Sequence, residues 1–549
     1  MSDSNIILNK VYNAYDISKF RSEVSEEINK IMNDLEGSYG EIVILKHLPR
    51  LGKTYNLLKY LNNSENTLSL YVSDIHKQME QIATNFNKMR IIKGAASICP
   101  LLKNPETSEN QMKYLNFLFS HKFKRNIACK QCNLYNNCIY NEQFDFPENN
   151  AIITIAKESL ANKRVHSAFD FIIFDENMHK AKELEPTCPP FETTALENLT
   201  YGEQIKDTYQ DIKWITESNT IIQDEDILKG LYEDAKFFGS DKILKTTINE
   251  TRTLKDGQNI LSFIVNLYET VEWAEKSYEI GEQQRTHYKP YLHYAFDILR
   301  EYGSNLIIAN ATFEEHIYNQ IKKQYSYKLP SIKEISEIPL ENKNSHLLNY
   351  NFLGRNCSKT GLEEYGSEIF PMIHGIHRFC SKKGLKSGLI TFNEYEEEFQ
   401  EFDVIDHFVA HRGKNDFDNV DVLVILGTFN IPRLGILEKN YAITGEYLQE
   451  KDLREWKTKN INGCKITLPQ NEQYQKTRLY LLYDEHLQAI LRSGAHIDNK
   501  KTIITFGYVP SRIEKIFNYK TFNSNKQLIN GYLTNIYTKR KRRRNNRKR

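Results

Sequence analysis

Short apolar runs alternate with amphipathic segments in the first third of the chain. Residues 41–45 (EIVIL) predict a buried strand, and residues 67–86 predict a strand, a turn and an amphipathic helix. The apolar runs return at residues 151–156 and 169–174, after an interruption at about 95–145. Strands that alternate with helices are typical of a parallel sheet covered by helices, so we expect an α/β lobe here.

Two further changes of pattern divide the rest of the chain. From about residue 187 to 300 the pattern is long and helical, which predicts a helical subdomain inserted in the first lobe. Strand-like runs return in NLIIANATF, SGLITFN, VDVLVILG and KKTIITF, and most of them outline a second α/β lobe. The expected boundaries are residues 1–95, 146–186 and 301–344 for the first lobe, 96–145 and 187–300 for its two insertions, 345–530 for the second lobe and 531–549 for a basic tail.

The net charge of the 549-residue chain hides an uneven distribution. Residues 539–549 contain nine Lys and Arg, so a chain with a net charge of +2 carries −7 outside this segment. A basic tail on an acidic body indicates a polyanionic partner such as nucleic acid. A solvated tail or a nuclear-import signal would have the same composition.

The sequence shows no signal for a membrane or for export. No apolar run approaches the ~20 residues that a membrane-spanning helix needs, and the N-terminus MSDSNIILNK lacks the apolar stretch of a signal peptide. We therefore expect an intracellular, cytoplasmic protein without a membrane partner, or a nuclear one if the host is eukaryotic. We also expect a monomer.

The segment HLPRLGKT, residues 47–54, follows the first predicted strand and precedes a helical pattern. A phosphate-binding loop of the form G-x-x-x-x-G-K-[ST] wraps phosphates with backbone N–H groups, and its Lys and hydroxyl reach phosphate and Mg²⁺. Gly52, Lys53 and Thr54 supply this chemistry, whereas His47 stands in place of the first glycine. The strand-loop-helix context favours a nucleotide site over a chance match.

A second phosphate-site motif ends the strand FIIFDE. Adjacent carboxylates after a buried strand suit the Walker B role, in which Asp175 holds Mg²⁺ and Glu176 orients the water that attacks the γ-phosphate. A solvated strand end or a helix cap would look the same in isolation. The upstream Gly-Lys-Thr makes the catalytic interpretation the better one.

Four of the eight cysteines cluster between these two motifs. They are Cys99, Cys129, Cys132 and Cys138, in the pattern C-x29-C-x2-C-x5-C. Four thiolates from one short segment suit either a tetrahedral zinc or a 4Fe–4S cluster, and the spacing alone does not choose between the two.

The order of these motifs resembles the iron-sulfur superfamily 2 DNA helicases related to XPD and DinG. In that family four cysteines lie between the two phosphate-site motifs and a helical arch domain follows the second, as residues 96–145 and 187–300 would do here. The segment DENMH is similar to the family's D-E-A-H box, with His179 one position late. The resemblance covers about residues 40–510 and implies two RecA-like P-loop lobes.

Downstream segments carry the rest of the resemblance. NAT is similar to the S-A-T motif that couples nucleotide state to strand movement, SGLITFNEYEEEF to the opening of the second lobe, and HRGKNDF to the segment before the family's fifth motif. LQAILRSG is similar to the Q-x-x-x-R motif, which implies that Gln488 is the coupling glutamine and Arg492 the arginine finger. Gly494 and Ala495 stand where the family has a further arginine.

The resemblance implies an ATP-dependent DNA helicase that uses Mg²⁺ and moves 5′ to 3′ on single-stranded or forked DNA. It also implies a 4Fe–4S cluster rather than zinc at the four cysteines. ATP would lie between the lobes, contacted by Lys53, Thr54, Asp175 and Glu176 on one side and by Arg492 on the other.

A second interpretation belongs to a different class of protein. A nucleic-acid-binding protein with a structural zinc module could keep a degenerate, inactive nucleotide fold. His47 and Arg50, which stand where many helicase loops have glycine, and the missing second arginine favour this alternative. The intact Gly-Lys-Thr motif and the Asp-Glu pair favour the motor.

Overall fold

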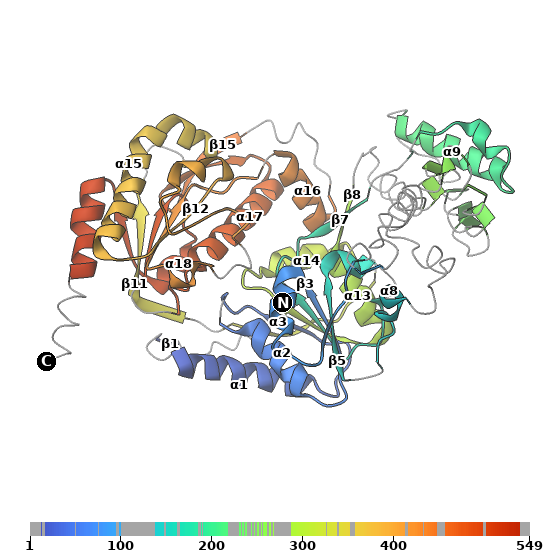
Figure 1. The fold of residues 1–549 in the computed structure, drawn as a ribbon, viewed down its shortest axis with the longest axis horizontal. Coiled ribbons are helices and arrows are strands. Elements are labelled where there is room, and N and C mark those ends of the chain that lie inside the picture. Colours follow the sequence, from blue (N-terminus) through green and yellow to red (C-terminus); the bar gives the residue numbers. More distant parts are fainter. Residues whose placement is uncertain are drawn as a thin grey trace.

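The structure is a computed structural model that describes most of the chain. The described residues are 12–13, 17–49, 51–74, 76–94, 98–99, 138–147, 150–161, 165–184, 188, 190–217, scattered positions from 230 to 267, 287–325, 327–337, 340–351, 357–411, 416–431, 433–446, 456–497 and 501–538. They form two α/β lobes that lie side by side, with an insertion around α9 that extends away from the first lobe (Figure 1).

The first lobe is a seven-stranded sheet in the order β10-β2-β9-β6-β3-β5-β4, and every neighbouring pair is parallel. Its strands are β10 (Ile332–Ser336), β2 (Ile42–Leu45), β9 (Asn305–Ala309), β6 (Phe171–Asp175), β3 (Leu68–Ser73), β5 (Ala151–Ala156) and β4 (Met89–Ile91). The five central strands are buried along their whole length, because helices cover both faces of the sheet.

Two groups of helices cover the first sheet. Helices α1 (Ile17–Leu35), α2 (Lys53–Asn63) and α3 (His76–Ala83) share one core cluster with the side chains of one sheet face. Helices α13 (Tyr291–Tyr302) and α14 (Glu315–Lys323) share a second cluster with the other face. The short helix α8 (Ile139–Glu142) and the 3-10 segment η2 (Lys157–Ala161) flank β5 in the sequence.

The second lobe is also a parallel sheet of seven strands, in the order β1-β11-β17-β14-β12-β13 with β18 paired to β11. The strands are β1 (Tyr12–Asn13), β11 (Leu340–Tyr350), β17 (Thr502–Phe506), β14 (Val422–Leu426), β12 (Ser387–Thr391), β13 (Val404–His407) and β18 (Phe517–Phe522). The helices are α15 (Lys359–Lys383), α16 (Arg433–Thr444), α17 (Glu472–Leu491), α18 (Ser511–Ile516) and the π-helix η9 (Gln527–Leu533). Short 3-10 turns η5 (Asn393–Tyr395), η6 (Glu397–Phe399) and η7 (Asp416–Asn419) and the antiparallel pair β15 (Trp456–Ile461) and β16 (Cys464–Pro469) complete it.

An antiparallel ribbon marks where the helical insertion leaves the first lobe. Strand β7 (Ala181–Leu184) pairs with β8 (His287–Pro290), so that Leu184 lies opposite His287. The chain therefore leaves the lobe after Leu184 and returns to it at His287 at the same point. The described part of this segment includes η4 (Thr193–Leu196) and α9 (Gly202–Glu217), which belong to a core cluster of their own.

The prediction of an α/β fold with two RecA-like lobes is confirmed by these sheets. Two details differ from the expected boundaries. Helix α13 packs on the first sheet rather than in the insertion, because its apolar face contacts the strands of the lobe. Strand β1 pairs with β11 of the second sheet, whereas the sequence pattern predicts residues 1–95 in the first lobe. Among the described residues, no helix has the length and apolar character needed to cross a membrane.

Candidate nucleotide site between the lobes

The segment that the sequence predicts to be a phosphate-binding loop, residues 47–54, connects β2 to α2 and lines a cavity that second-lobe residues also line. Helix α2 starts at Lys53, and its N-cap Gly52 has a φ of 84°, a left-handed conformation that glycine adopts without strain. The backbone N–H of Asn56 bonds to the Gly52 carbonyl at 2.8 Å, which closes the first helical turn. The free N–H groups of such a helix start are a binding site for phosphate.

Asp175 ends β6 and meets the phosphate-binding loop directly. Its Oδ2 accepts hydrogen bonds from Thr54 Oγ1 at 3.1 Å and from the Tyr71 hydroxyl at 2.7 Å. Burial and the nearby Asp175 raise the pKa of Tyr71, so the phenol stays protonated and remains a donor. The second oxygen, Oδ1, is buried and has no hydrogen-bond partner among the described residues.

These groups fit a magnesium–nucleotide complex. Lys53 is only 6% exposed, and no described residue accepts a hydrogen bond from its Nζ. A buried ammonium without an acceptor is unfavourable unless a ligand supplies the negative charge. Lys53 would therefore hold phosphate, and Thr54 with Asp175 would hold Mg²⁺, since hydroxyl and carboxylate oxygens suit that ion.

The second lobe supplies the opposite wall through the end of α17. Asp484, Gln488 and Arg492 follow one another at intervals of four residues and so share a helix face, with Arg492 as the residue that caps α17. These three side chains, together with Gly52, Lys53, Thr54, Asp175 and Glu176, line one cavity of about 580 Å³ between the lobes. Lys439 of α16 lines the same cavity, and burial lowers the pKa of its ammonium.

Direct contacts tie the two walls together. Thr312, at the end of the NAT segment, donates a hydrogen bond to Asp484 at 2.5 Å. His496 bonds through Nε2 to the carbonyl of Pro49 in the phosphate-binding loop at 2.7 Å. His179 of the DENMH segment packs edge-on against Tyr480 of α17, with ring centroids 5.7 Å apart. Each of these contacts joins the first lobe to α17 or to the turn that follows it.

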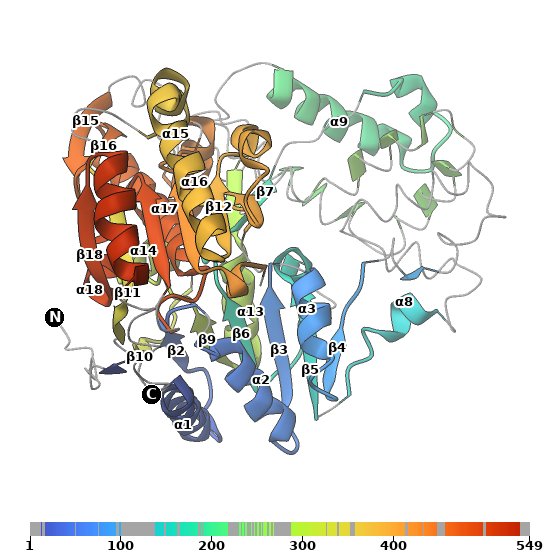
Figure 2. The same ribbon diagram turned by 60° about the vertical axis from the view of Figure 1, so that its left-hand side comes forward.

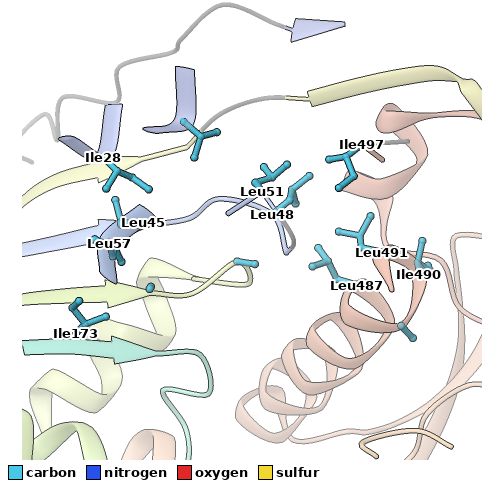
Figure 3. Packing of buried hydrophobic residues seen from close by; sticks show 14 of the residues in the cluster. Ile28, Leu45, Leu48, Leu51, Leu57, Ile173, Leu487, Ile490, Leu491 and Ile497 are labelled. Atoms are coloured by element: carbon cyan, nitrogen blue, oxygen red, sulfur yellow. The ribbon is translucent and has the colours of Figure 1, made fainter. Parts of the chain in front are cut away.

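His47, which stands in place of the first glycine of the motif, has a structural partner. His47 is fully buried and hydrogen-bonded with Ser336 Oγ at 2.7 Å; burial and the nearby Lys53 lower its pKa to about 3, so the imidazole is neutral. Figure 3 shows Leu48 and Leu51 pointing at Leu487, Leu491 and Ile497 of the second lobe. The loop therefore also forms an apolar contact between the lobes through Leu48 and Leu51.

The remaining predicted residues fall partly outside this site. Cys99 and Cys138 are buried, whereas Cys129 and Cys132 lie outside the described residues, so the metal cluster stays a prediction. Arg50, the Arg412–Gly413 pair and the basic tail from residue 539 also lie outside them.

Sequence reasoning missed several side chains of the site. Tyr71 and Asp74 come from the end of β3, and Lys439 and Asp484 come from the second lobe. Only Asp74 had a local signal: it follows a predicted strand, as Asp175 does, and the carboxyl ends of neighbouring parallel strands meet at one sheet edge.

No protein-family model and no curated protein matches the sequence. Solved structures with some likeness include the Escherichia coli DEAH/RHA helicase HrpB, at 8% identity and a TM-score of 0.31 over 88% of this chain and 42% of HrpB. A DEAD box protein from Methanococcus jannaschii matches at 9% identity and a TM-score of 0.28 over 95% of this chain and 99% of its own. Mycobacterium smegmatis helicase Lhr, bound to ssDNA and AMP-PNP, matches at 9% identity and a TM-score of 0.29 over 91% of this chain and 49% of Lhr.

Proposed function

We propose that the chain is an ATP-dependent DNA helicase that moves along single-stranded DNA. The observation that carries this proposal is the cavity between the lobes. It brings the phosphate-binding loop and the Asp175–Glu176 pair of one lobe together with Gln488 and Arg492 of the other. A site built from two lobes can respond to hydrolysis by a change in their separation, which a site within one lobe cannot do.

Each side chain has a separate task in this proposal. Lys53 binds the β- and γ-phosphates, and Glu176 orients the water for attack in line with the leaving group. Mg²⁺, held by Thr54 and Asp175, neutralises charge on the phosphates when it is bound. Arg492 stabilises the charge of the transition state from the second lobe, where the buried surroundings strengthen its effect.

Loss of the γ-phosphate would weaken the attraction between Lys53, Arg492 and their shared ligand. The Thr312–Asp484 hydrogen bond joins the two lobes, and through it the change at the nucleotide would alter the position of one lobe relative to the other. Repeated closure and opening of the cavity between the lobes would then move the DNA-binding surfaces of the two lobes relative to each other. DNA as the track is proposed from the basic tail and the motif order, and the 5′ to 3′ direction and the 4Fe–4S cluster from the family resemblance alone.

The alternative is a nucleic-acid-binding protein with a zinc module and an inactive site. Two observations favour it. Leu48 and Leu51 fill space between the lobes that a moving motor must open, and Ala495 is fully buried where the family has an arginine. A static assembly would keep both features without any need for turnover.

ATP hydrolysis measured with and without single-stranded DNA separates the two. We expect DNA to stimulate hydrolysis in the parent protein and Lys53→Ala to abolish hydrolysis while DNA binding persists, because its ammonium contacts phosphate rather than DNA. Lys59→Ala is the matched control, since Lys59 is an exposed lysine on the same helix. Equal rates of ATP hydrolysis in the parent and in Lys53→Ala would refute the proposed helicase and leave the nucleic-acid-binding protein with an inactive site.

A further inference from the structure

A fully buried lysine lies behind the candidate catalytic glutamate. Lys157 follows β5 and has no solvent exposure. Its Nζ lies 3.1 Å from Asp74 Oδ1 and donates a hydrogen bond of 2.8 Å to the main-chain carbonyl of Glu176. It also lies 4.8 Å above the ring of Phe174. Lysine is almost never fully buried unless it is paired, and Lys157 is paired with Asp74. We therefore ask what this buried ion pair does for the neighbouring site.

Asp74 connects this lysine to the next residue of the turn. It follows β3, which lies between β6 and β5 in the sheet (Figure 2). Asp74 can therefore contact both Lys157, after β5, and the turn after β6. It accepts a hydrogen bond from Asn177 Nδ2 and lies 3.3 Å from Lys180 Nζ. Burial would raise the pKa of Asp74, but Lys157 and Lys180 lower it below its usual value, so the carboxylate stays ionised.

The turn that these residues hold is unusual. Glu176 and Asn177 both have positive φ, 52° and 38°, although neither is glycine. Such conformations persist when surrounding contacts fix them, and they concentrate at functional sites. Here Lys157 holds the carbonyl between the two residues, Asp74 holds the side chain of Asn177, and the N–H of Glu176 bonds to the Ala309 carbonyl at 3.0 Å.

We propose that Lys157 and Asp74 are positioning residues that fix the Glu176–Asn177 turn and thereby aim the Glu176 carboxylate at the attacking water. This proposal rests on the proposed ATPase function. Neither Lys157 nor Asp74 needs to touch the nucleotide: they act through the backbone that carries Glu176. These residues follow three neighbouring strands: Glu176 follows β6, Asp74 follows β3 and Lys157 follows β5.

The test is the steady-state kinetics of DNA-stimulated hydrolysis in the Lys157→Met variant. We expect kcat to fall about 10²-fold with the KM for ATP within twofold of the parent, because a misplacement of about 1 Å affects chemistry rather than ground-state binding. The matched control is Lys88→Met, since Lys88 also donates to a backbone carbonyl of the first lobe, that of Ser64 at 2.6 Å. This control should keep parental kcat.

Two further variants distinguish a loss of positioning from a loss of folding stability. Lys157→Met alone leaves Asp74 as a buried charge without its main partner, so the double variant Lys157→Met/Asp74→Asn should regain parental melting temperature while its kcat stays low. In a Glu176→Gln background, Lys157→Met should cause no further loss of the residual turnover, because both changes remove the same function.

The outcomes separate the two claims. If the double variant recovers both melting temperature and kcat, or if the losses from Lys157→Met and Glu176→Gln multiply, Lys157 only stabilises the fold and the positioning role is refuted. If the parent shows no hydrolysis that depends on Lys53, the proposed function fails and the role of Lys157 fails with it.

Discussion

Replacing Leu48 and Leu51 with alanine should let the two lobes separate when no nucleotide is bound. The two side chains are 2% and 0% exposed, and they pack against the second lobe (Figure 3). Each truncation removes three carbons, and a buried methylene contributes about 0.8 kcal/mol, so the pair contributes up to about 5 kcal/mol. Even half of that amount changes the ratio of open to closed molecules roughly 60-fold.

Energy transfer between dyes at positions 59 and 382 measures this separation. Both positions are exposed, on α2 of the first lobe and α15 of the second. We expect a single high-transfer population in the parent and a broad low-transfer population in the Leu48→Ala/Leu51→Ala variant, which a non-hydrolysable ATP analogue should partly restore.

The control for this experiment is Leu57→Ala, which removes three apolar carbons from α2 inside the first lobe. It should lower the melting temperature without a change in energy transfer. If the Leu48→Ala/Leu51→Ala variant shows the same transfer distribution as the parent, the apolar side chains of the loop do not hold the lobes together.

Three further predictions address the site and the metal. Acidification should destabilise the fold, because burial lowers the pKa of His47 to about 3 and that of His486 to about 4. The unfolded chain then binds more protons below about pH 6.5, so the free energy of unfolding at pH 5 should be about 2 kcal/mol lower per histidine than at pH 8; urea titrations with less than 1 kcal/mol of change would contradict this. Tyr71→Phe removes a hydrogen-bond donor to Asp175 and should weaken the binding of Mg²⁺ more than the binding of ATP. The Mg²⁺ concentration that gives half-maximal hydrolysis should therefore rise, and an unchanged Mg²⁺ dependence would show that Tyr71 does not support the metal site. Anaerobically prepared protein should contain about four irons, and Cys132→Ser should lose them, whereas stoichiometric zinc without iron would reverse the choice of metal.

Much of the fold could be predicted because its signals are local. Buried parallel strands require unbroken apolar runs, so EIVIL and FDFIIF are visible without any knowledge of their neighbours. The Gly52–Lys53–Thr54 and Asp175–Glu176 motifs are visible for the same reason, since each needs adjacent residues at a strand end. The place of α13 could not be predicted, because an apolar helix face does not show whether it packs on a sheet or on other helices.

The contacts between distant segments lay beyond sequence reasoning. Nothing near Leu51 indicates that it will face Leu491, since the pairing exists only once two lobes are docked. The salt bridge between Asp74 and Lys157 likewise depends on the order of strands in the sheet, which places β3 beside β5. Only the resemblance to a family motif identifies Arg492 in the sequence, because a helix-end arginine is common on protein surfaces.

The rate of ATP hydrolysis by the Arg492→Ala variant tests most directly whether the cavity between the lobes is a shared ATPase site. We expect this variant to bind ATP as the parent does but to lose about 10³-fold in DNA-stimulated turnover, the usual effect of removing an arginine finger. The matched control is Arg478→Ala on the same helix, whose guanidinium lies 5.1 Å from the ring centroid of Trp456, and it should hydrolyse ATP at the parental rate. Turnover of Arg492→Ala within about threefold of the parent, a difference of only ~0.7 kcal/mol in barrier, would contradict a catalytic role for the second lobe.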